Sequence, residues 1–150
     1  MNFSSFQDVI DFAIKREEEA IESYAGMIEK TRMPGLKELL ADPRDAEKKH
    51  KKSLPNTSSD KIPAPKIKDV TDLKISDYLV EEPTSPDMNF QDLLIFAAKK
   101  EKKAADLYSQ LSDRSDDPEL KKLFDFLVQQ EKSHKLKLEK EYDEHVLEWD

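Results

Sequence analysis

A chain of 150 residues with a net charge of −8 and 39% charged residues fits a single soluble domain and excludes several functions. The acidic balance argues against binding to nucleic acid or to an anionic membrane, because both favour a basic surface. The sequence has no cysteine, which excludes disulfides, thiolate zinc sites and iron–sulfur clusters within it. No apolar run approaches the ~20 residues that span a bilayer, and the first residues do not resemble a signal peptide. We therefore expect a cytoplasmic protein with neither nucleic acid nor membrane as partner.

Four segments carry apolar residues alternately four and three positions apart, which is typical of helices that pack in a bundle. Two of them lie within residues 5–54 and two within residues 89–146. Ser5 and Asp117 are the predicted N-terminal caps of the first and fourth helices. Pro43 falls inside the second segment, where it would remove a backbone hydrogen bond. We expect a kink or a restart of the helix there.

Residues 55–88 form a long connection between the two pairs of segments. Its five prolines make a continuous helix unfavourable, and adjacent antiparallel helices need only ~2–8 residues between them. A connection of this length can instead run along the whole bundle and deliver the third helix parallel to the second. Its apolar residues are expected to pack as a short turn or strap, and they are Leu73, Ile75, Tyr78, Leu79 and Val80. The pattern predicts an all-α fold, a four-helix bundle with a long crossover between helices 2 and 3.

The two halves of the chain repeat each other at an offset of 84 positions without a gap. Each half carries one lone glutamate, a tyrosine seven residues later and, thirty residues after the glutamate, a Glu-x-x-His motif. The matched pairs are Glu17 with Glu101, Tyr24 with Tyr108, Glu47 with Glu131, and His50 with His134. The repeat predicts one domain over residues 1–150 with an internal pseudo-twofold axis.

The acids and histidines of the repeat all fall at core positions of their helices, at nearly the same level along the bundle. Residues three apart share a helix face, so each Glu-x-x-His can bind one metal ion. Four buried carboxylates would not stay ionised together without compensation, and two divalent ions cancel their charge. The alternative, six unrelated polar residues, is disfavoured because buried unpaired charge is costly. The predicted metal ligands, which would also form the catalytic centre, are Glu17, Glu47, His50, Glu101, Glu131 and His134.

Oxygen-rich ligation with one imidazole per metal suits iron or manganese better than a structural zinc ion. We expect two iron ions, with manganese or a mixed pair as the alternative. Tyr24 and Tyr108 follow the lone glutamates by two turns on the same face, so each hydroxyl could bond a ligand carboxylate or serve only as part of the core. His145 lies ~16 Å along the helix from His134 and is expected at a helix end or on the surface. Trp149 could pack on a partner subunit or belong to a frayed end.

The two motifs Glu-Lys-Lys-His-Lys and Glu-Lys-Ser-His-Lys, with Phe-Ala five residues before each lone glutamate, resemble the ferritin-like di-iron carboxylate proteins. The rubrerythrin group is the most similar, and residues 72–80 also resemble its crossover connections. The resemblance covers nearly the whole chain, but Ala104 stands where rubrerythrins usually carry an extra ligand glutamate. A cysteine-ligated rubredoxin module is also missing, so electrons would come from another protein.

The resemblance implies a di-iron oxidoreductase of rubrerythrin type, with a role in oxidative stress. It would reduce hydrogen peroxide or dioxygen with electrons from an external donor protein. The alternative is an iron-binding or ferroxidase-type protein for iron uptake or delivery, and a third interpretation is a metal-stabilised scaffold. We expect a homodimer, because closed twofold pairing is the commonest symmetry and because residues after His134 are too few for the fifth helix of cage-forming ferritins. Ile75, Tyr78 and Leu79 would form the contact, or seal the core of a monomer.

Overall fold

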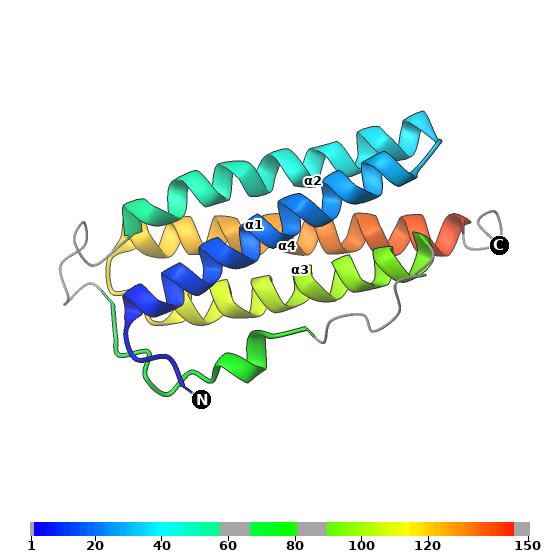
Figure 1. Ribbon diagram of the computed structural model, residues 1–150. Coiled ribbons are helices and arrows are strands. Elements are labelled where there is room, and N and C mark those ends of the chain that lie inside the picture. The colour runs from blue at the N-terminus through cyan, green and yellow to red at the C-terminus, as the bar shows by residue number, and fades with distance from the viewer. Residues whose placement is uncertain (1, 58–66, 81–89, 146–150) are drawn as a thin grey trace.

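The computed structural model describes residues 2–57, 67–80 and 90–145, which form a bundle of helices (Figure 1). Helix α1 packs mainly against α2, and α3 against α4. In chain order the helices are α1 (Phe6–Lys30), α2 (Pro34–Ser53), the short 3-10 helices η1 (Leu54–Thr57) and η3 (Ile75–Tyr78), α3 (Phe90–Asp113) and α4 (Pro118–His145). The predicted all-α, ferritin-like four-helix architecture is confirmed. None of these helices, within the described residues, has the length and apolar character to cross a membrane.

The long crossover determines how the two helix pairs meet. Figure 1 shows that α1 and α2 run in opposite directions, as do α3 and α4, whereas α2 and α3 run in the same direction. Residues 67–80, the described part of the crossover, pass along the same side of the bundle as α1 and α3. The predicted parallel delivery of the third helix is therefore present.

The helix starts follow from local chemistry. The Ser5 hydroxyl accepts a hydrogen bond of 3.1 Å from the backbone N–H three residues later, and Asp117 caps α4 in the same way at 3.0 Å. These caps satisfy N–H groups that have no partner within the helix. Pro34 and Pro118 are the first residues of α2 and α4, where the missing N–H costs nothing.

Pro43 does not interrupt α2, so the expected restart of the helix is wrong. The helix runs unbroken from Pro34 to Ser53 with Pro43 buried inside it. Leu36 and Leu40 are buried before the proline, and Glu47 and His50 after it. Because tertiary packing supports the same helix face on both sides, it offsets the loss of one backbone hydrogen bond.

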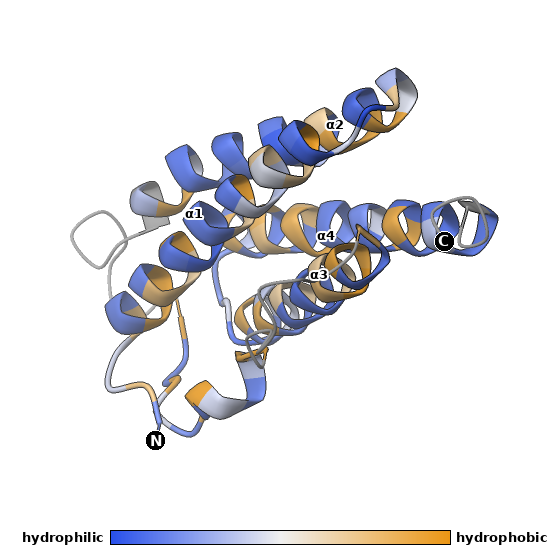
Figure 2. Cartoon of the chain, turned by 45° about the vertical axis from the view of Figure 1, so that its right-hand side comes forward, coloured by the Kyte–Doolittle hydropathy of each residue, from blue (hydrophilic) through white to orange (hydrophobic). Residues whose placement is uncertain are grey.

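The apolar core is divided into two clusters by a polar layer that crosses all four helices. Figure 2 shows the apolar sides of the helices turned toward one another and the polar sides turned outward. One cluster includes Val9, Ile10, Leu54, Leu111, Phe124 and Leu127. The other cluster includes Met27, Leu36, Leu40, Leu94, Ala97 and Leu138. Along every helix, the glutamates and histidines of the repeat lie between the two clusters.

The crossover is attached to the bundle as a strap. Val70, Leu73 and Tyr78 are buried and belong to the first apolar cluster. Arg114, at the end of α3, donates two hydrogen bonds to the carboxylate of Asp72, at 2.6 and 2.9 Å. The predicted strap is present, and it covers the seam between α1 and α3.

This packing buries most of the crossover residues that were expected to form a homodimer contact. Tyr78 is 7% exposed and packs against the ring of Phe3, so it is committed to its own bundle. Ile75 is half-buried against the same cluster, and only Leu79 stays exposed, at 44%. The homodimer remains a prediction, with little of the crossover left to form it.

Two leucines of the crossover test whether the strap is part of the core. Leu73 is 6% exposed, so Leu73→Ala should lower the free energy of unfolding by about 2–3 kcal/mol, through lost burial and a cavity. Leu79→Ala removes the same atoms from an exposed position and should change it by less than about 0.5 kcal/mol. Chemical denaturation of both variants measures the difference. Equal effects would show that the strap contributes no more than a surface loop.

Candidate metal centre

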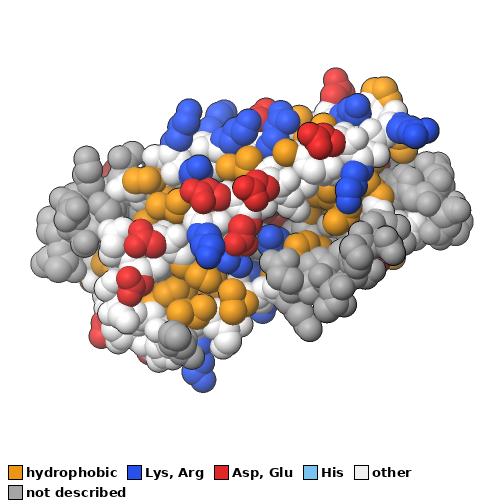
Figure 3. All heavy atoms as spheres, viewed as in Figure 1, with side chains coloured by type: hydrophobic (Ala, Val, Ile, Leu, Met, Phe, Trp, Pro, Cys, Tyr) orange, Lys and Arg blue, Asp and Glu red, His pale blue; other side chains and the backbone are white. Residues whose placement is uncertain are grey.

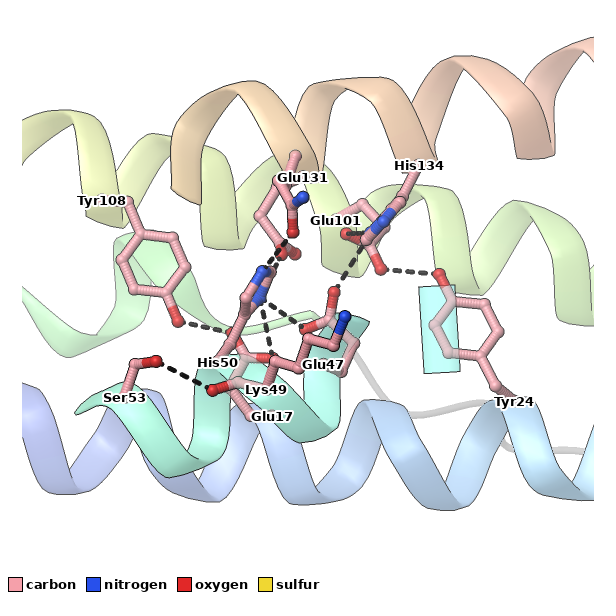
Figure 4. A network of polar contacts seen from close by, with 11 residues as sticks. Glu17, Tyr24, Glu47, Lys49, His50, Ser53, Glu101, Tyr108, Glu131 and His134 are labelled. Atoms are coloured by element: carbon pink, nitrogen blue, oxygen red, sulfur yellow. Dashed lines mark hydrogen bonds and ion pairs between the residues drawn. The ribbon is translucent and has the colours of Figure 1, made fainter. Parts of the chain in front are cut away.

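All four helices contribute to one buried polar cluster (Figure 4). The six predicted ligands are each at most 5% exposed. Their ligand atoms form two groups, in each of which all atoms lie within 4.8 Å of one another. The groups are Glu17, Glu47, His50 and Glu131, and Glu47, Glu101, Glu131 and His134. The structure therefore brings all six residues together, while their role as metal ligands stays a prediction.

The two groups share Glu47 and Glu131. Each histidine also contacts the shared glutamate of the other repeat. His50 Nδ1 is 3.0 Å from Glu131 Oε1 but 3.6 Å from Glu47 Oε2, and His134 Nδ1 is 3.1 Å from Glu47 Oε1. The sequence pattern suggested that each Glu-x-x-His holds its own metal. Each group keeps the glutamate and histidine of one motif together and adds the shared glutamate of the other repeat.

The two tyrosines support the lone glutamates across the repeat. The Tyr24 hydroxyl donates to Glu101 Oε1 at 2.6 Å, and the Tyr108 hydroxyl donates to Glu17 Oε1 at 2.5 Å. Burial, together with the nearby carboxylates, raises the pKa of both tyrosines well above the ordinary value. The hydroxyls consequently stay protonated, and each fixes one carboxylate oxygen so that the other can face the centre of the cluster.

Several atoms at the centre of the cluster are buried without a well-aligned hydrogen bond from the protein, although ion-pair contacts surround them. Glu17 Oε2, Glu101 Oε2, Glu131 Oε1 and His50 Nδ1 have no hydrogen-bond partner among the residues that the structure describes. Leaving buried polar atoms without partners is costly. Carboxylate oxygens and imidazole nitrogens converging on one space are the donor set of iron or manganese. The residues therefore fit two divalent cations.

Protons take the place of cations in the metal-free cluster. Burial alone would raise the pKa of Glu47, but hydrogen bonds with His134 and His50 outweigh it and lower the pKa to about 2. Burial and two neighbouring carboxylates raise the pKa of Glu131 well above its ordinary value. Burial opposes charging of His134, yet its contacts with Glu101 and Glu47 raise its pKa to about 9. Metal ions must displace these protons to bind.

Sequence reasoning missed Gln130. Its side-chain oxygen lies 2.6 Å from His50 Nε2, so a proton on Nε2 is held there and Nδ1 is directed to the carboxylates. The repeat could not reveal this contact, because the position that corresponds to Gln130 is Ala46. Among the other expected positions, His145 ends α4, and Trp149 lies outside the described residues.

A cavity of about 30 Å³ lies between α1 and α3 and touches the cluster. Its wall includes the four glutamates of the cluster. Tyr78 and Val80 of the crossover also line it, and Ala104 contributes a methyl group where the family resemblance would place an extra ligand glutamate. A small molecule could reach the carboxylates along this seam of the bundle.

Removal of the tyrosine hydroxyls tests their support of the lone glutamates. Tyr24→Phe and Tyr108→Phe should each weaken metal affinity by about tenfold, as is usual when a partner of a ligand is lost. Competition with a chelator for Mn²⁺ or Co²⁺ measures the affinity. Tyr142→Phe, on α4 and away from the cluster, is the control and should bind as the original protein does. An unchanged affinity in both variants would show that the hydroxyls only fill the core.

The stability of the metal-free protein should fall as the pH rises. The pKa of His134 is about 9 in the folded state against an ordinary value of 6.5. Its contribution is therefore fully present below pH 6.5 and lost as the pH rises through 9, a change of about 3 kcal/mol. The raised pKa values of His50 and Glu131 act in the same direction. Urea denaturation at pH 6 and pH 9.5 measures the change.

Metal-loaded protein is the control for this pH dependence, because a bound imidazole is neutral at both pH values. The loss of stability should be smaller there. A metal-free protein that is equally stable at pH 6 and pH 9.5 would contradict the proton-compensated cluster.

A solved structure of a hypothetical protein from Pyrococcus furiosus shares 29% sequence identity, with a TM-score of 0.74, over 98% of this chain and 93% of that chain. None of the curated proteins compared with the chain matches it. The rubrerythrin family model matches residues 8–142. On this match the chain belongs to the rubrerythrin family.

Proposed function

We propose that the protein is a di-iron oxidoreductase that reduces hydrogen peroxide, or dioxygen, to water. The observation that carries the proposal is the pair of ligand groups sharing Glu47 and Glu131, with a small cavity against them. Two cations held by common carboxylates lie close together, as two-metal sites generally require. The cavity of about 30 Å³ has room for a molecule of two or three non-hydrogen atoms, since a water needs ~10–15 Å³ by this measure.

Reduction of one hydrogen peroxide consumes two electrons and two protons and yields two waters. Two iron ions bound in the cluster would supply one electron each, and a separate donor protein would restore them. The residues of this chain have supporting tasks. Glu47 and Glu131 would be shared by the two ligand groups, and the Tyr24 and Tyr108 hydroxyls hold Glu101 and Glu17 in place. The two apolar clusters exclude bulk water from both ends of the site.

A second candidate is an iron-binding or ferroxidase-type protein that takes up or delivers iron without sustained turnover. Ala104 favours it. This side chain lines the cavity beside Glu101 but offers no donor atom, so the ligand set lacks the additional carboxylate usual in rubrerythrins. Fewer carboxylates stabilise a ferric pair less, which would make release of iron easier.

Metal content and oxidation kinetics separate the two candidates. Anaerobic loading should give two ferrous ions per chain. Stopped-flow mixing should then show faster oxidation by hydrogen peroxide than by dioxygen, followed by repeated turnover when a reducing donor is supplied. Stoichiometric oxidation with no turnover would favour the iron-binding protein. A metal content near zero would contradict both.

A variant that lacks one shared carboxylate, paired with a control variant on the same helix, tests the role of the cluster. Glu47→Gln keeps the shape of the side chain but removes the negative charge, so the metal content should fall below two per chain. Oxidation by peroxide should slow by about 100-fold, as misplacement of reacting groups commonly does. Glu38→Gln removes an exposed carboxylate from the same helix and should leave both measurements unchanged.

A further inference from the structure

A groove of about 360 Å³ lies between α2 and α4 and has His50 in its wall. Ala46 and Ser53 of α2, with Leu123 and Phe126 of α4, are among the other residues that line it. These two helices pack much less extensively against each other than each packs against the other helix of its own half. The metal cluster thus comes near the surface on this face as well as at the cavity between α1 and α3.

The imidazole ring of His50 stands between this groove and the carboxylates. Its Nδ1 lies 3.0 Å from Glu131 Oε1, and Figure 4 shows the ring turned from α2 toward the cluster. Its Nε2 lies 2.6 Å from the side-chain oxygen of Gln130, which also lines the groove. Because the side chain of His50 is only 3% exposed, the ring closes the inner wall of the groove. Rotation of this ring would join the groove to the cluster, and the contact with Gln130 opposes that rotation.

The groove is large enough for both the turned ring and an ion that still carries water. A water needs ~10–15 Å³ by the measure that gives about 360 Å³ for the groove. The cavity between α1 and α3 measures only about 30 Å³, so a cation would enter it almost without water. Removing an ion from water is costly. Space therefore favours the groove as the entrance for a cation.

The charges at the cavity between α1 and α3 also disfavour a cation there. Apart from the four glutamates of the cluster, the charged side chains of the described chain that line it are Arg16, Lys100 and Lys103. Figure 3 views this face of the molecule, where basic and acidic side chains gather near the middle of α1. The side chains of Arg16 and Lys100 are only 24% and 15% exposed, so water screens them poorly. A divalent ion on this path would meet strong repulsion before it reached the carboxylates.

The groove between α2 and α4 lacks this basic lining. Apart from His50, the charged side chains of the described chain that line it are Asp42, Asp45 and Lys49, which leaves one negative charge in excess. Arg44 pairs with Asp45 at 3.1 Å and offsets part of it. The groove is thus close to neutral, and a cation is not repelled from it. The contrast between the two openings, rather than an acidic pocket, selects the groove.

We propose that divalent metal ions enter the cluster through the groove between α2 and α4, with His50 as the gate and Gln130 as the residue that holds the gate closed. An ion passes when the ring turns into the groove, and the ring then returns as a ligand. The gate lies on one side of the repeat only, because Ala46 stands where a second amide would face His134. The inference rests on the proposed function only in requiring that the cluster binds metal ions.

Blocking each opening in turn tests the route with Co²⁺ as the probe and no redox step. Stopped-flow visible absorption measures association with the metal-free protein, and a chase with excess chelator measures dissociation. Ala46→Phe fills the groove and should slow association by about tenfold, within the range over which related association rates vary. Dissociation should slow equally, because ions leave by the route through which they enter. Ala20→Leu fills the cavity between α1 and α3 and should change neither rate.

The gate itself is tested by removing the amide that holds it. Gln130→Ala should raise both the association and the dissociation rate of Co²⁺ by about fivefold, as expected for the loss of one hydrogen bond that opposes opening. Gln129→Ala, at the exposed neighbouring position, is the matched control and should behave as the original protein does. A glutamine that only orients the ligand would change dissociation and leave association as it was.

A pair of charge variants covers the case in which a filled variant does not fold, which thermal melting establishes. Asp42→Asn combined with Asp45→Asn should slow association by about threefold at low salt, and less at high salt, where screening removes the attraction. Glu22→Gln combined with Glu29→Gln removes two exposed carboxylates from α1 and should leave the rate unchanged. Equal rates in the two double variants would count against the route.

The outcomes separate this route from the proposed function. Absence of Co²⁺ binding overturns both. Association that is slowed by Ala20→Leu and not by a folded Ala46→Phe overturns the route, as does association that neither variant changes. Unchanged association in Gln130→Ala overturns the gate. If the rates change as expected but ferrous protein fails to turn over peroxide, the oxidoreductase is overturned and the route stands.

Discussion

The burial of four carboxylates at one level of the bundle is the constraint on which the rest of the structure depends. Glu17, Glu47, Glu101 and Glu131 lie where an ordinary four-helix bundle would have leucines. Their mutual repulsion must be relieved within a few ångströms, and the two histidines, two tyrosine hydroxyls and bound protons do so in the absence of metal. The apolar clusters on both sides hold the helices together despite the polar layer. The apolar contacts that stabilise the bundle thus lie apart from the layer of carboxylates and histidines.

Side-chain contacts from one half of the repeat to the other join the two helix pairs. The contacts across the repeat between Tyr24 and Glu101, and between Tyr108 and Glu17, connect α1 to α3. Those of His50 with Glu131 and of His134 with Glu47 connect α2 to α4. Both pairs pack much less extensively than α1 with α2 or α3 with α4. Neither half can complete a metal group alone, so a cation bound here would also fasten one half of the chain to the other.

The repeat explains how much could be predicted and what could not. Because the offset selects Glu17 rather than Glu18 from an acidic run, all the clustered ligands and both tyrosines could be named from sequence. The helix boundaries and the crossover followed from periodicity and proline positions. Gln130 could not be found, since its counterpart is an alanine. The effect of Pro43 depended on packing on either side of it, and the crossed partners of the histidines depend on side-chain directions that spacing does not specify.

The two halves of the repeat carry similar residues on one face of the bundle and different residues on the other. On the α1–α3 face, Arg16 agrees in charge with Lys100, and Ala20 matches Ala104, so both metal positions meet the same surroundings. On the α2–α4 face, Gln130 faces His50 whereas the corresponding residue is Ala46. The imidazole of His50 is therefore held at Nε2 by an amide oxygen, and its neighbours differ from those of His134. Two cations in this cluster would consequently share carboxylates and a cavity yet have unequal imidazole ligands. Such a pair is expected to differ in affinity and in reduction potential, because the partner of a ligating imidazole tunes its basicity.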